Sequence, residues 1–371
     1  MQSKLNILFA NSIQMFAGGE VWMLRTMGEL QNRGHHVTLL CRPGTELAER
    51  AERQNISTHR IKITGDFNPA TILKIARFLK QNRIDVILTN MDKELRLCGM
   101  AAKLTDHPPV ISRRGIDYPL KNKIHYRLSY NWLANQVVAN SQSTKKALLR
   151  NAPWLNPDRI QVIYNGLNTE NYDEAHTHDL REELKIPSGV PLVGFVGQLD
   201  ERKGFDALLP AFQYLTTISP DAILLLAGTG PLENQIKTFA KENQLENNIK
   251  ILGFRNDIPN LMRTIDLLVL PSWWEGFGIV LIEAMAAGKP TITTAVSSMP
   301  EIVTHEKTGL IVPPHDRQAL ATALEKIITN PQLARQMGES GQRDVLDRFT
   351  LEKMVDKYEA LFYQLIKKKN A

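Results

Sequence analysis

The sequence PSWWEGFGIVLIEAMAAGKP, residues 271–290, holds the densest structural signal in the chain. It follows an apolar run, Ile265–Leu270, which has the length and bulk of a buried strand. The two glycines in WWEGFG favour a loop, and a helix is predicted to begin near Ile279 and to end at Gly288. A strand, a glycine-containing loop and a helix N-terminus bring backbone N–H groups and the positive end of the helix dipole together. Such an arrangement binds anions.

Two carboxylates lie beside this helix start, Glu275 in the loop and Glu283 inside the helix. A purely helical path between them would span roughly 12 Å at about 1.5 Å per residue, which suits a ligand as long as a nucleotide sugar. Because Glu283 lies in a nearly all-apolar helix, its ionised carboxylate needs hydrogen-bond donors. Two interpretations of Glu283 stay open, a buried structural ion pair and a ligand contact. Together with Glu275 and the glycine loop, it favours ligand binding.

The pattern of Glu275, seven intervening residues and Glu283 resembles the signature of family 4 glycosyltransferases, which are retaining enzymes of the GT-B fold. The resemblance implies an α/β protein with two Rossmann-like, doubly wound parallel-sheet domains that face each other across a cleft. It also implies that Glu275 faces the donor sugar and that Glu283 binds the ribose hydroxyls. The backbone amides that hold sugar and phosphate would come from Gly276, Phe277, Gly278 and Ile279.

The rest of the chain alternates buried runs with helix-patterned segments, which is typical of parallel βαβ units. Strands are predicted first at residues 4–10, 36–41, 59–63, 84–89, 109–112, 136–140 and 160–164. A second set is predicted at 191–196, 222–227, 249–252, 265–270, 291–294 and 309–312. Ligands of such sheets bind at the carboxyl ends of the strands, so the loops that follow these runs are the candidate binding loops.

A polar stretch, Asn171–Gly189, separates the two sets of strands and predicts an interdomain connection. We expect an acceptor-binding domain over residues 1–175 and a nucleotide-sugar-binding domain over residues 185–350. The final helix pattern, Leu351–Lys369, ends in three lysines. The resemblance implies that residues 351–371 pack back on the N-terminal domain.

Length and composition set the broad class. A chain of 371 residues favours two domains over one core. Its two cysteines, Cys41 and Cys98, give neither a disulfide framework nor a metal-ligand cluster, which fits a reducing cytoplasm. No apolar run reaches transmembrane length, and the N-terminus lacks a signal-peptide pattern. We therefore expect a soluble cytoplasmic protein, with peripheral contact at the inner face of an anionic membrane as an additional hypothesis.

The charge is unevenly distributed. Residues 1–180 carry 24 Lys and Arg against 16 Asp and Glu, a net charge of +8, whereas the remainder carries 21 against 23. A basic front half predicts an anionic partner, either a phosphorylated substrate or membrane headgroups. Nucleic acid is the weakest candidate partner, because no nucleic-acid-reading motif accompanies the charge.

Basic and aromatic residues interleave between Tyr118 and Trp132. One interpretation is an acceptor-binding or membrane-surface patch, where amphipathic side chains settle. The other is a solvated helix face whose aromatic rings pack inward. The sequence does not separate the two.

Two further loops follow predicted strands and contain candidate acceptor-binding residues, namely Asp92, Lys93, Arg113 and Arg114. Many members of the family have His-Gly where this chain has Arg114-Gly115, so no histidine role is transferred. Paired guanidinium groups suit an anionic acceptor, because arginine binds phosphate bidentately.

Adjacent glycines, Gly18 and Gly19, lie between the first strand and a helix, where backbone amides can approach a phosphate. The resemblance implies that this loop reaches the donor phosphates. In the second half, Arg202 and Lys203 follow a predicted strand, and such a turn is either solvated or part of a diphosphate site. Beside the other motifs we favour the diphosphate role, because fixed cations stabilise the charge that grows on a leaving phosphate.

The loop that starts at Gly253 and Phe254 resembles the family loop whose backbone contacts the nucleotide base. The segment AGTGP at residues 227–231 lacks the third glycine of a dinucleotide fingerprint, which disfavours a dehydrogenase.

These observations predict a retaining, metal-independent glycosyltransferase that moves a hexose from a nucleotide-diphosphate sugar to a hydroxyl of a glycan or lipid-linked acceptor. Synthesis of bacterial cell-surface polysaccharide or lipopolysaccharide is the expected setting. No metal or other cofactor is expected, since the chain has no Asp-x-Asp and no ligand cluster. A nucleotide-sugar epimerase or another GT-B enzyme is one alternative, and an inactive nucleotide-sugar-binding protein is a second.

Overall fold

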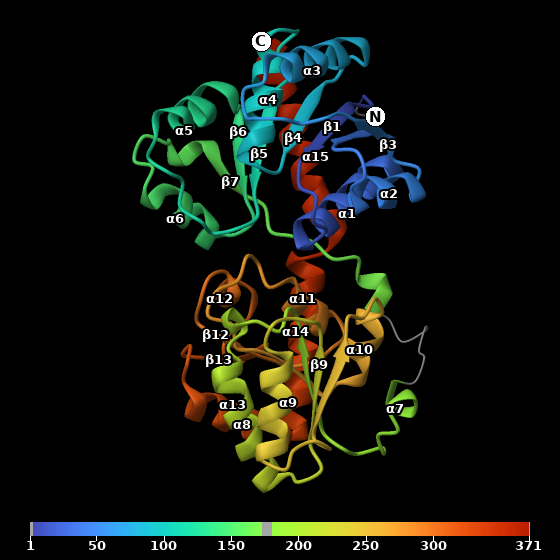
Figure 1. Cartoon of the computed structure of the whole chain (residues 1–371), viewed down its shortest axis with the longest axis vertical. Coiled ribbons are helices and arrows are strands. Elements are labelled where there is room, and N and C mark those ends of the chain that lie inside the picture. The colour runs from blue at the N-terminus through green and yellow to red at the C-terminus, as the bar shows by residue number, and fades with distance from the viewer. Residues whose placement is uncertain (1–2, 173–179, 371) are drawn as a thin grey trace. The chain divides into compact units, whose positions relative to one another are not determined.

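The computed structural model describes residues 3–172 and 180–370 and divides the chain into two compact units. Unit 1 comprises Met1–Gly166 and Leu351–Ala371, and unit 2 comprises Leu167–Thr350 (Figure 1). Part of the predicted interdomain connection, residues 173–179, lies outside the described residues, as does the expected end of the first domain at residue 175.

Unit 1 contains a seven-stranded parallel sheet in the order β3-β2-β1-β4-β5-β6-β7. The strands are β1 (Asn6–Asn11), β2 (His36–Cys41), β3 (Ser57–Arg60), β4 (Val86–Thr89), β5 (Val110–Arg114), β6 (Gln136–Ala139) and β7 (Ile160–Val162). Each overlaps its predicted range. The strand predicted at 59–63 lies earlier, because Ile61 and Ile63 are buried beyond the end of the ladder and extend the apolar pattern past the strand.

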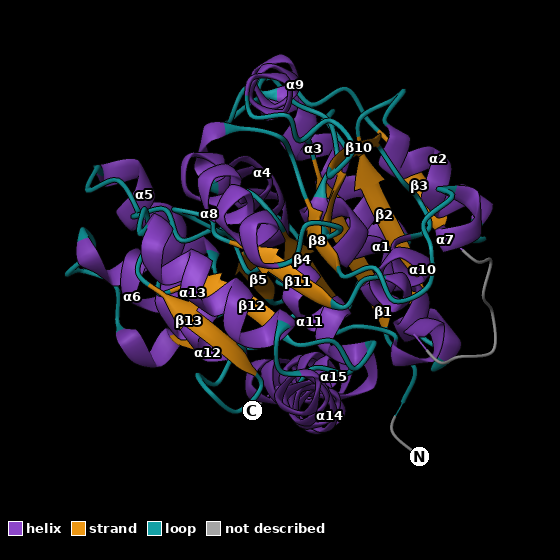
Figure 2. Ribbon diagram, turned by 90° about the horizontal axis from the view of Figure 1, so that it is seen from below, coloured by secondary structure: helices purple, strands orange, loops and turns teal. Residues whose placement is uncertain are grey.

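Helices cover this sheet, as parallel strands buried on both faces require (Figure 2). They are α1 (Gly18–Asn32), α2 (Glu46–Arg53), α3 (Pro69–Gln81), α4 (Asp92–Lys103), α5 (Ile124–Leu128), α6 (Gln142–Arg150) and α15 (Leu351–Asn370). A π-helix, η1 (Ser129–Leu133), continues α5, and a 3-10 helix, η2 (Pro157–Arg159), precedes β7. The side chains of Thr45, Asn68 and Ser141 accept hydrogen bonds from first-turn amides and so determine where α2, α3 and α6 begin.

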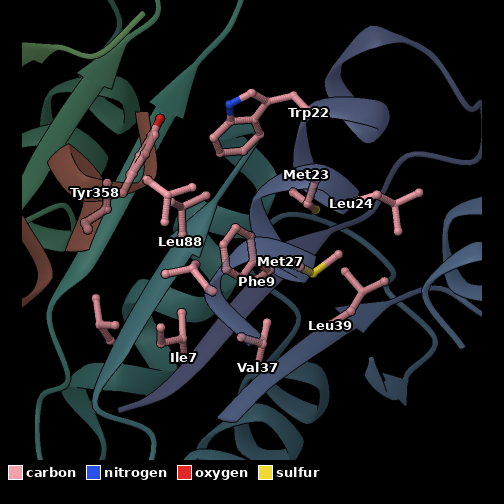
Figure 3. Packing of buried hydrophobic residues seen from close by; sticks show 14 of the residues in the cluster. Ile7, Phe9, Trp22, Met23, Leu24, Met27, Val37, Leu39, Leu88 and Tyr358 are labelled. Carbon is pink, nitrogen blue, oxygen red and sulfur yellow. The ribbon is translucent and has the colours of Figure 1, made fainter. Parts of the chain in front are cut away.

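The core on one face of this sheet joins the two ends of the chain (Figure 3). Phe9 and Leu88 of the sheet are fully buried. They pack in one cluster with Trp22 and Met27 of α1 and with Tyr358 of α15. The rings of Trp22 and Tyr358 lie 5.5 Å apart. Residues 351–370 therefore belong to the core of unit 1, although they follow unit 2 in the chain.

A cluster of charged side chains also holds α15 against the rest of unit 1. Glu359 accepts hydrogen bonds from Arg33 Nη1 at 2.9 Å and from His35 Nε2 at 3.0 Å. The Leu5 N–H points at His35 Nδ1 at 3.2 Å, which places the ring proton on Nε2. Burial by itself raises the pKa of Glu359, but the hydrogen bonds from Arg33 and His35 outweigh it and hold the pKa below its ordinary value.

This lowered pKa predicts a pH-dependent stability. The contribution of Glu359 is complete above its unfolded pKa of about 4.3 and is lost as the pH falls through the lower folded value. Glu359→Gln should therefore destabilise unit 1 by about 1 kcal/mol at pH 7. The difference from wild type should shrink as the pH falls below the unfolded pKa and should vanish once Glu359 is protonated in the folded state as well. Thermal melts across pH 3–8 measure this, with the exposed Glu339→Gln as a matched control, and a difference that grows in acid would contradict it.

Unit 2 contains a six-stranded parallel sheet in the order β10-β9-β8-β11-β12-β13. The strands are β8 (Leu192–Val196), β9 (Ile223–Ala227), β10 (Ile249–Gly253), β11 (Leu267–Leu270), β12 (Thr291–Thr294) and β13 (Gly309–Val312). The helices are α7 (Leu180–Glu183), α8 (Phe205–Ile218), α9 (Glu233–Glu242), α10 (Ile258–Thr264), α11 (Ile279–Ala286), α12 (Met299–Ile302), α13 (Arg317–Ile328) and α14 (Pro331–Arg348), with 3-10 turns η3 (Thr169–Tyr172) and η4 (Glu201–Lys203).

Both sheets reverse their strand order once, between β1 and β4 in unit 1 and between β8 and β11 in unit 2. The predicted fold class, α/β with two doubly wound parallel sheets, is therefore confirmed. In open α/β sheets, ligands bind beyond the carboxyl ends of the strands at such a reversal. The residues that follow β1, β4, β8 and β11 are thus the first candidates for function.

Candidate functional site

The site in unit 2 begins with an ion pair at the reversal of strand order. Lys203, at the end of η4 after β8, contacts Glu275 Oε1 through its Nζ, and Glu275 follows β11. Both side chains are largely buried, with 13% and 14% of their surface exposed. Ser272 Oγ donates to the same Glu275 Oε1 at 3.2 Å. The predicted cation and the predicted carboxylate are therefore brought together.

Backbone contacts fix the distance between the loop that carries Lys203 and the loop that carries Glu275. The Trp273 N–H donates to the Arg202 carbonyl at 2.7 Å. Gly204 has a φ of +75°, and a Cβ at that position would lie 2.1 Å from the Pro271 carbonyl oxygen. Only glycine permits both this conformation and this approach. The distance between Lys203 and Glu275 is thus set by the backbone as well as by charge.

A third loop, after β12, contacts the loop of Glu275 through two serines. Ser297 Oγ accepts a hydrogen bond from the Glu275 N–H at 3.2 Å. Ser298 Oγ donates to the Phe277 carbonyl at 3.0 Å. Ser297 has a φ of +48°, a left-handed conformation that is uncommon for a residue other than glycine. The two hydroxyls thus position the backbone on both sides of Gly276.

We expect Ser297 to act as a positioning residue for Glu275. Ser297→Ala removes the hydroxyl and keeps a side chain that disfavours the left-handed conformation. Ser297→Gly removes the hydroxyl and also makes that conformation favourable. Each should lower kcat about three- to tenfold with a smaller change in KM. The glycine variant should be about 1 kcal/mol more stable than the alanine variant. Steady-state kinetics and thermal melts measure this, and wild-type kcat in Ser297→Ala would show that the hydroxyl does not position Glu275.

Arg202 lies beside the pair but is more exposed, with 47% of its side chain accessible. Its Nη2 donates to Asp200 at 2.6 Å and to Gln198 at 3.2 Å, and the guanidinium lies 5.6 Å from the centre of the Trp274 ring. Arg202 and Lys203 therefore form adjacent cations on one turn, with Lys203 in the interior position.

The helix predicted after the glycine loop is α11. Gly278 precedes it with a φ of +74°, and Phe277 is buried. The first-turn amides of α11, from Ile279 onward, lie at the positive end of the helix dipole. Glu283 lies one turn further on and is 7% exposed, so its carboxylate is close to the core.

On the other side of the sheet reversal, Gly253 ends β10 and its carbonyl accepts from the Gly228 N–H at 2.8 Å. Phe254 is 73% exposed.

In unit 1, Gly18 and Gly19 are the first residues of α1, which therefore begins earlier than predicted, and the loop after β1 ends before them. A Cβ on Gly19 would lie 3.3 Å from Asn90 Nδ2, so the helix start approaches the loop after β4. Glu20 accepts from the Ala17 N–H at 3.0 Å and from Asn11 Nδ2 at 2.8 Å. The carboxylate of Glu20 therefore caps α1 and orders the glycine loop.

A second buried carboxylate, Glu94, joins the loops after β1 and β4. Its Oε1 accepts from the Ser12 N–H at 2.6 Å, and Glu94 is 1% exposed. Over residues 3–172 and 180–370, its Oε2 has no hydrogen-bond partner. Burial raises the pKa of Glu94, while the hydrogen bonds from Ser12 oppose that shift. The sequence pointed to the segment that contains Glu94 but not to this residue.

Arg113 is an interior residue. Its guanidinium lies 3.7 Å from the centre of the Trp22 ring and donates to Asn90 and Asn165, both at 3.0 Å. It is 3% exposed, and burial lowers its pKa while Tyr358 opposes that shift.

Arg114 contacts a different set of residues from Arg113. It pairs with Asp92 at 3.0 Å, and the buried Tyr130 hydroxyl donates to the same carboxylate oxygen at 2.5 Å. Lys93 lies 3.8 Å from Asp66. The structure therefore joins Asp92 with Arg114 and places Arg113 apart from them. The acceptor roles of all four residues stay predictions.

No group of three or more His, Cys, Asp or Glu side chains within the described ranges is arranged to hold a metal ion. Both cysteines are buried free thiols. None of the helices in residues 3–172 and 180–370 has the length and apolar character that crossing a membrane requires.

Two Rossmann-like units are the architecture of the GT-B glycosyltransferases, and a cation and a carboxylate are joined here at one sheet reversal. Family comparison agrees with this class. Residues 16–171 match the model described as Glycosyltransferase Family 4, and residues 177–344 match the model described as Glycosyl transferases group 1. The chain belongs to glycosyltransferase family 4, whose retaining enzymes transfer a hexose from a nucleotide sugar.

Two curated relatives match over nearly their whole length. The Escherichia coli UDP-Gal:alpha-D-GlcNAc-diphosphoundecaprenol alpha-1,3-galactosyltransferase is 25% identical, with 98% of each chain covered. The Bacillus anthracis N-acetyl-alpha-D-glucosaminyl L-malate synthase is 26% identical, with 91% of this chain and 92% of the relative covered. Among solved structures, a glycosyltransferase from Rickettsia africae superposes with a TM-score of 0.89 at 24% identity, covering 99% of this chain and all of that one. This last similarity concerns the fold alone.

Proposed function

We propose that the chain transfers a hexose from a UDP-hexose to a hydroxyl of an anionic, lipid-linked glycan during synthesis of a bacterial cell-surface polysaccharide or lipopolysaccharide. The observation that carries the donor half of this proposal is the Lys203–Glu275 pair at the reversal between β8 and β11. A cation and a carboxylate at this point suit the two ends of an activated sugar, the diphosphate and the hexose hydroxyls.

The chemistry assigns these groups different roles. As the bond between the hexose C1 and the β-phosphate oxygen breaks, negative charge grows on that oxygen. Lys203, Arg202 and the amides at the start of α11 stabilise this charge. The acceptor oxygen forms the new bond to C1 on the same face of the sugar. Its proton passes to the departing phosphate oxygen, and the products are the glycoside and UDP.

Glu275 orients the hexose in this proposal. Ser272 and Lys203 both engage its Oε1. Over the part of the chain that the structure describes, no hydrogen bond is made by its Oε2, which is the oxygen we assign to a sugar hydroxyl. The proposal gives Glu283 the ribose hydroxyls and Gly253 and Phe254 the base. Gly18 and Gly19 are assigned to the donor phosphates.

Support for an anionic acceptor comes from charge and from the two relatives. Residues 1–180 have a net charge of +8. The E. coli relative is named for a diphosphoundecaprenol acceptor and the B. anthracis relative for L-malate, and both of these acceptors are acids. We propose Lys93 and Arg114 as the acceptor-binding residues, with the lipid-linked diphosphate preferred, and Asp92 orients Arg114 through their ion pair. The interior position of Arg113 argues against direct contact between this residue and the acceptor.

The test is a transfer assay with radiolabelled UDP-hexoses and two acceptors, an undecaprenyl-diphosphate sugar and L-malate. We expect an α-linked product on the lipid-linked acceptor from an α-linked donor, identified by NMR of the anomeric proton. Transfer to malate alone would contradict the proposed lipid-linked acceptor. Conversion of the donor to another UDP-hexose without acceptor would establish the epimerase alternative instead.

Metal independence is tested in the same assay. The diphosphate in this proposal is held by protein cations, so 5 mM EDTA should leave the rate within about twofold of its untreated value. A loss of activity that MgCl₂ or MnCl₂ restores would contradict the prediction.

A further inference from the structure

One segment of unit 1 exposes apolar side chains in a regular pattern. Ile124, Leu128 and Trp132 follow one another at four-residue spacing along α5 and η1 and are 68%, 55% and 54% exposed. Residues at this spacing lie on one face of a helix. The opposite face is already packed, since Tyr130 and Leu133 are buried. The outer face, called the 124–132 stripe below, is therefore apolar without contributing to the core.

Positive charge surrounds the stripe. No Asp or Glu occurs between Tyr118 and Pro157, whereas six Lys and Arg do: Lys121, Lys123, Arg127, Lys145, Lys146 and Arg150. Lys121, Lys123 and Arg127 are exposed next to the stripe, and Lys103 of α4 lies 5.7 Å from the centre of the Trp132 ring. The other three belong to α6, which lies at the same edge of unit 1 as α5 in both views (Figures 1 and 2).

We infer that the 124–132 stripe and the cations beside it dock on the surface of an anionic lipid bilayer. Cations alone would suit any polyanion, but a soluble phosphate or a nucleic acid offers no apolar phase for Ile124, Leu128 and Trp132. A bilayer interface offers both, because a helix lying in it buries apolar side chains while lysine and arginine contact anionic headgroups. Tryptophan is suited to this boundary, since its ring is apolar and its N–H is polar.

This docking rests on different residues from the proposed transfer, although it would bring the enzyme to the lipid-linked acceptor proposed above. Flotation of the full chain with vesicles separates the two, because it needs neither donor nor acceptor. In 0.1 M NaCl we expect binding to vesicles with 30% phosphatidylglycerol at least tenfold tighter than binding to pure phosphatidylcholine. Raising the salt to 0.5 M should weaken it.

Two double variants test the apolar stripe and the neighbouring cations separately. Leu128→Gln with Trp132→Ala should weaken binding to anionic vesicles at least tenfold. Lys121→Glu with Lys123→Glu should abolish the preference for phosphatidylglycerol. Leu73→Gln, which changes a 60% exposed leucine on α3, is the matched control and should bind as wild type. All variants should keep wild-type melting temperatures and wild-type UDP-hexose hydrolysis in the absence of acceptor.

Equal binding by wild type and Leu128→Gln/Trp132→Ala would overturn the inference. A second result would also overturn it: the wild type shows no vesicle binding but forms a dimer in sedimentation velocity, and the double variant is a monomer. The stripe would then contact a second copy of the chain. Vesicle binding without any lipid-linked transfer would support docking while contradicting the proposed acceptor.

Discussion

Lys203→Met should lower kcat for hexose transfer about 10²- to 10³-fold while the chain stays folded. The methionine keeps the length and apolar stem of lysine but removes the only charge that directly contacts Glu275 among the interactions described above. A fixed charge that stabilises a developing oxyanion is worth about this much in kcat. Steady-state kinetics with saturating donor and acceptor measure the loss, and circular dichroism and melting temperature confirm the fold.

The matched control is Lys237→Met on α9. Lys237 also pairs with a glutamate, Glu233, at 2.7 Å, but it lies on an exposed helix face. We expect its transfer rate to equal that of wild type. If Lys203→Met kept more than a tenth of the wild-type kcat, the leaving-group role of Lys203 would be refuted.

Glu275→Gln should produce a second loss of about 10²-fold or more in kcat. In glutamine one carboxylate oxygen is replaced by an NH2 group, which cannot accept a hydrogen bond from a sugar hydroxyl, so the orientation of the hexose is lost. It also leaves Lys203 largely buried without its counter-charge, which destabilises unit 2. We therefore expect a lower melting temperature for Glu275→Gln, and also for Lys203→Met, which leaves the Glu275 carboxylate without its counter-charge.

The double variant Lys203→Met/Glu275→Gln distinguishes a shared role from two separate ones. Because both groups serve one activated sugar, their effects on kcat should be far from additive. The melting temperature of the double variant should recover part of the loss seen in Glu275→Gln, since no unpaired buried charge remains. Additive losses in kcat would indicate that the two side chains act at different steps.

The sheets were predictable because strands buried on both faces appear as continuous apolar runs. The ranges of β2, β12 and β13 match the structure residue for residue, and the glycine loop with the start of α11 at Ile279 is also confirmed. The proximity of Lys203 to Glu275 followed from topology, since β8 and β11 are neighbours and their loops leave the same edge.

Contacts that depend on distant loops were not predictable. Ser297 reaches Glu275 from 22 positions further along the chain, and its left-handed backbone leaves no local pattern. Arg113 is the penultimate residue of β5, at the candidate edge, yet Trp22 and two asparagines from separate loops hold it in the interior. The basic and aromatic segment contained both alternatives, because Tyr130 packs inward whereas Trp132 faces outward two residues later.

Titration calorimetry of UDP and of uridine, on wild type and on Lys203→Met, measures most directly whether the diphosphate binds at this ion pair. Uridine carries the base and ribose but no phosphate. We expect Lys203→Met to weaken UDP binding at least tenfold and to leave uridine binding unchanged. Equal UDP affinity in the two proteins would contradict a diphosphate site at Lys203.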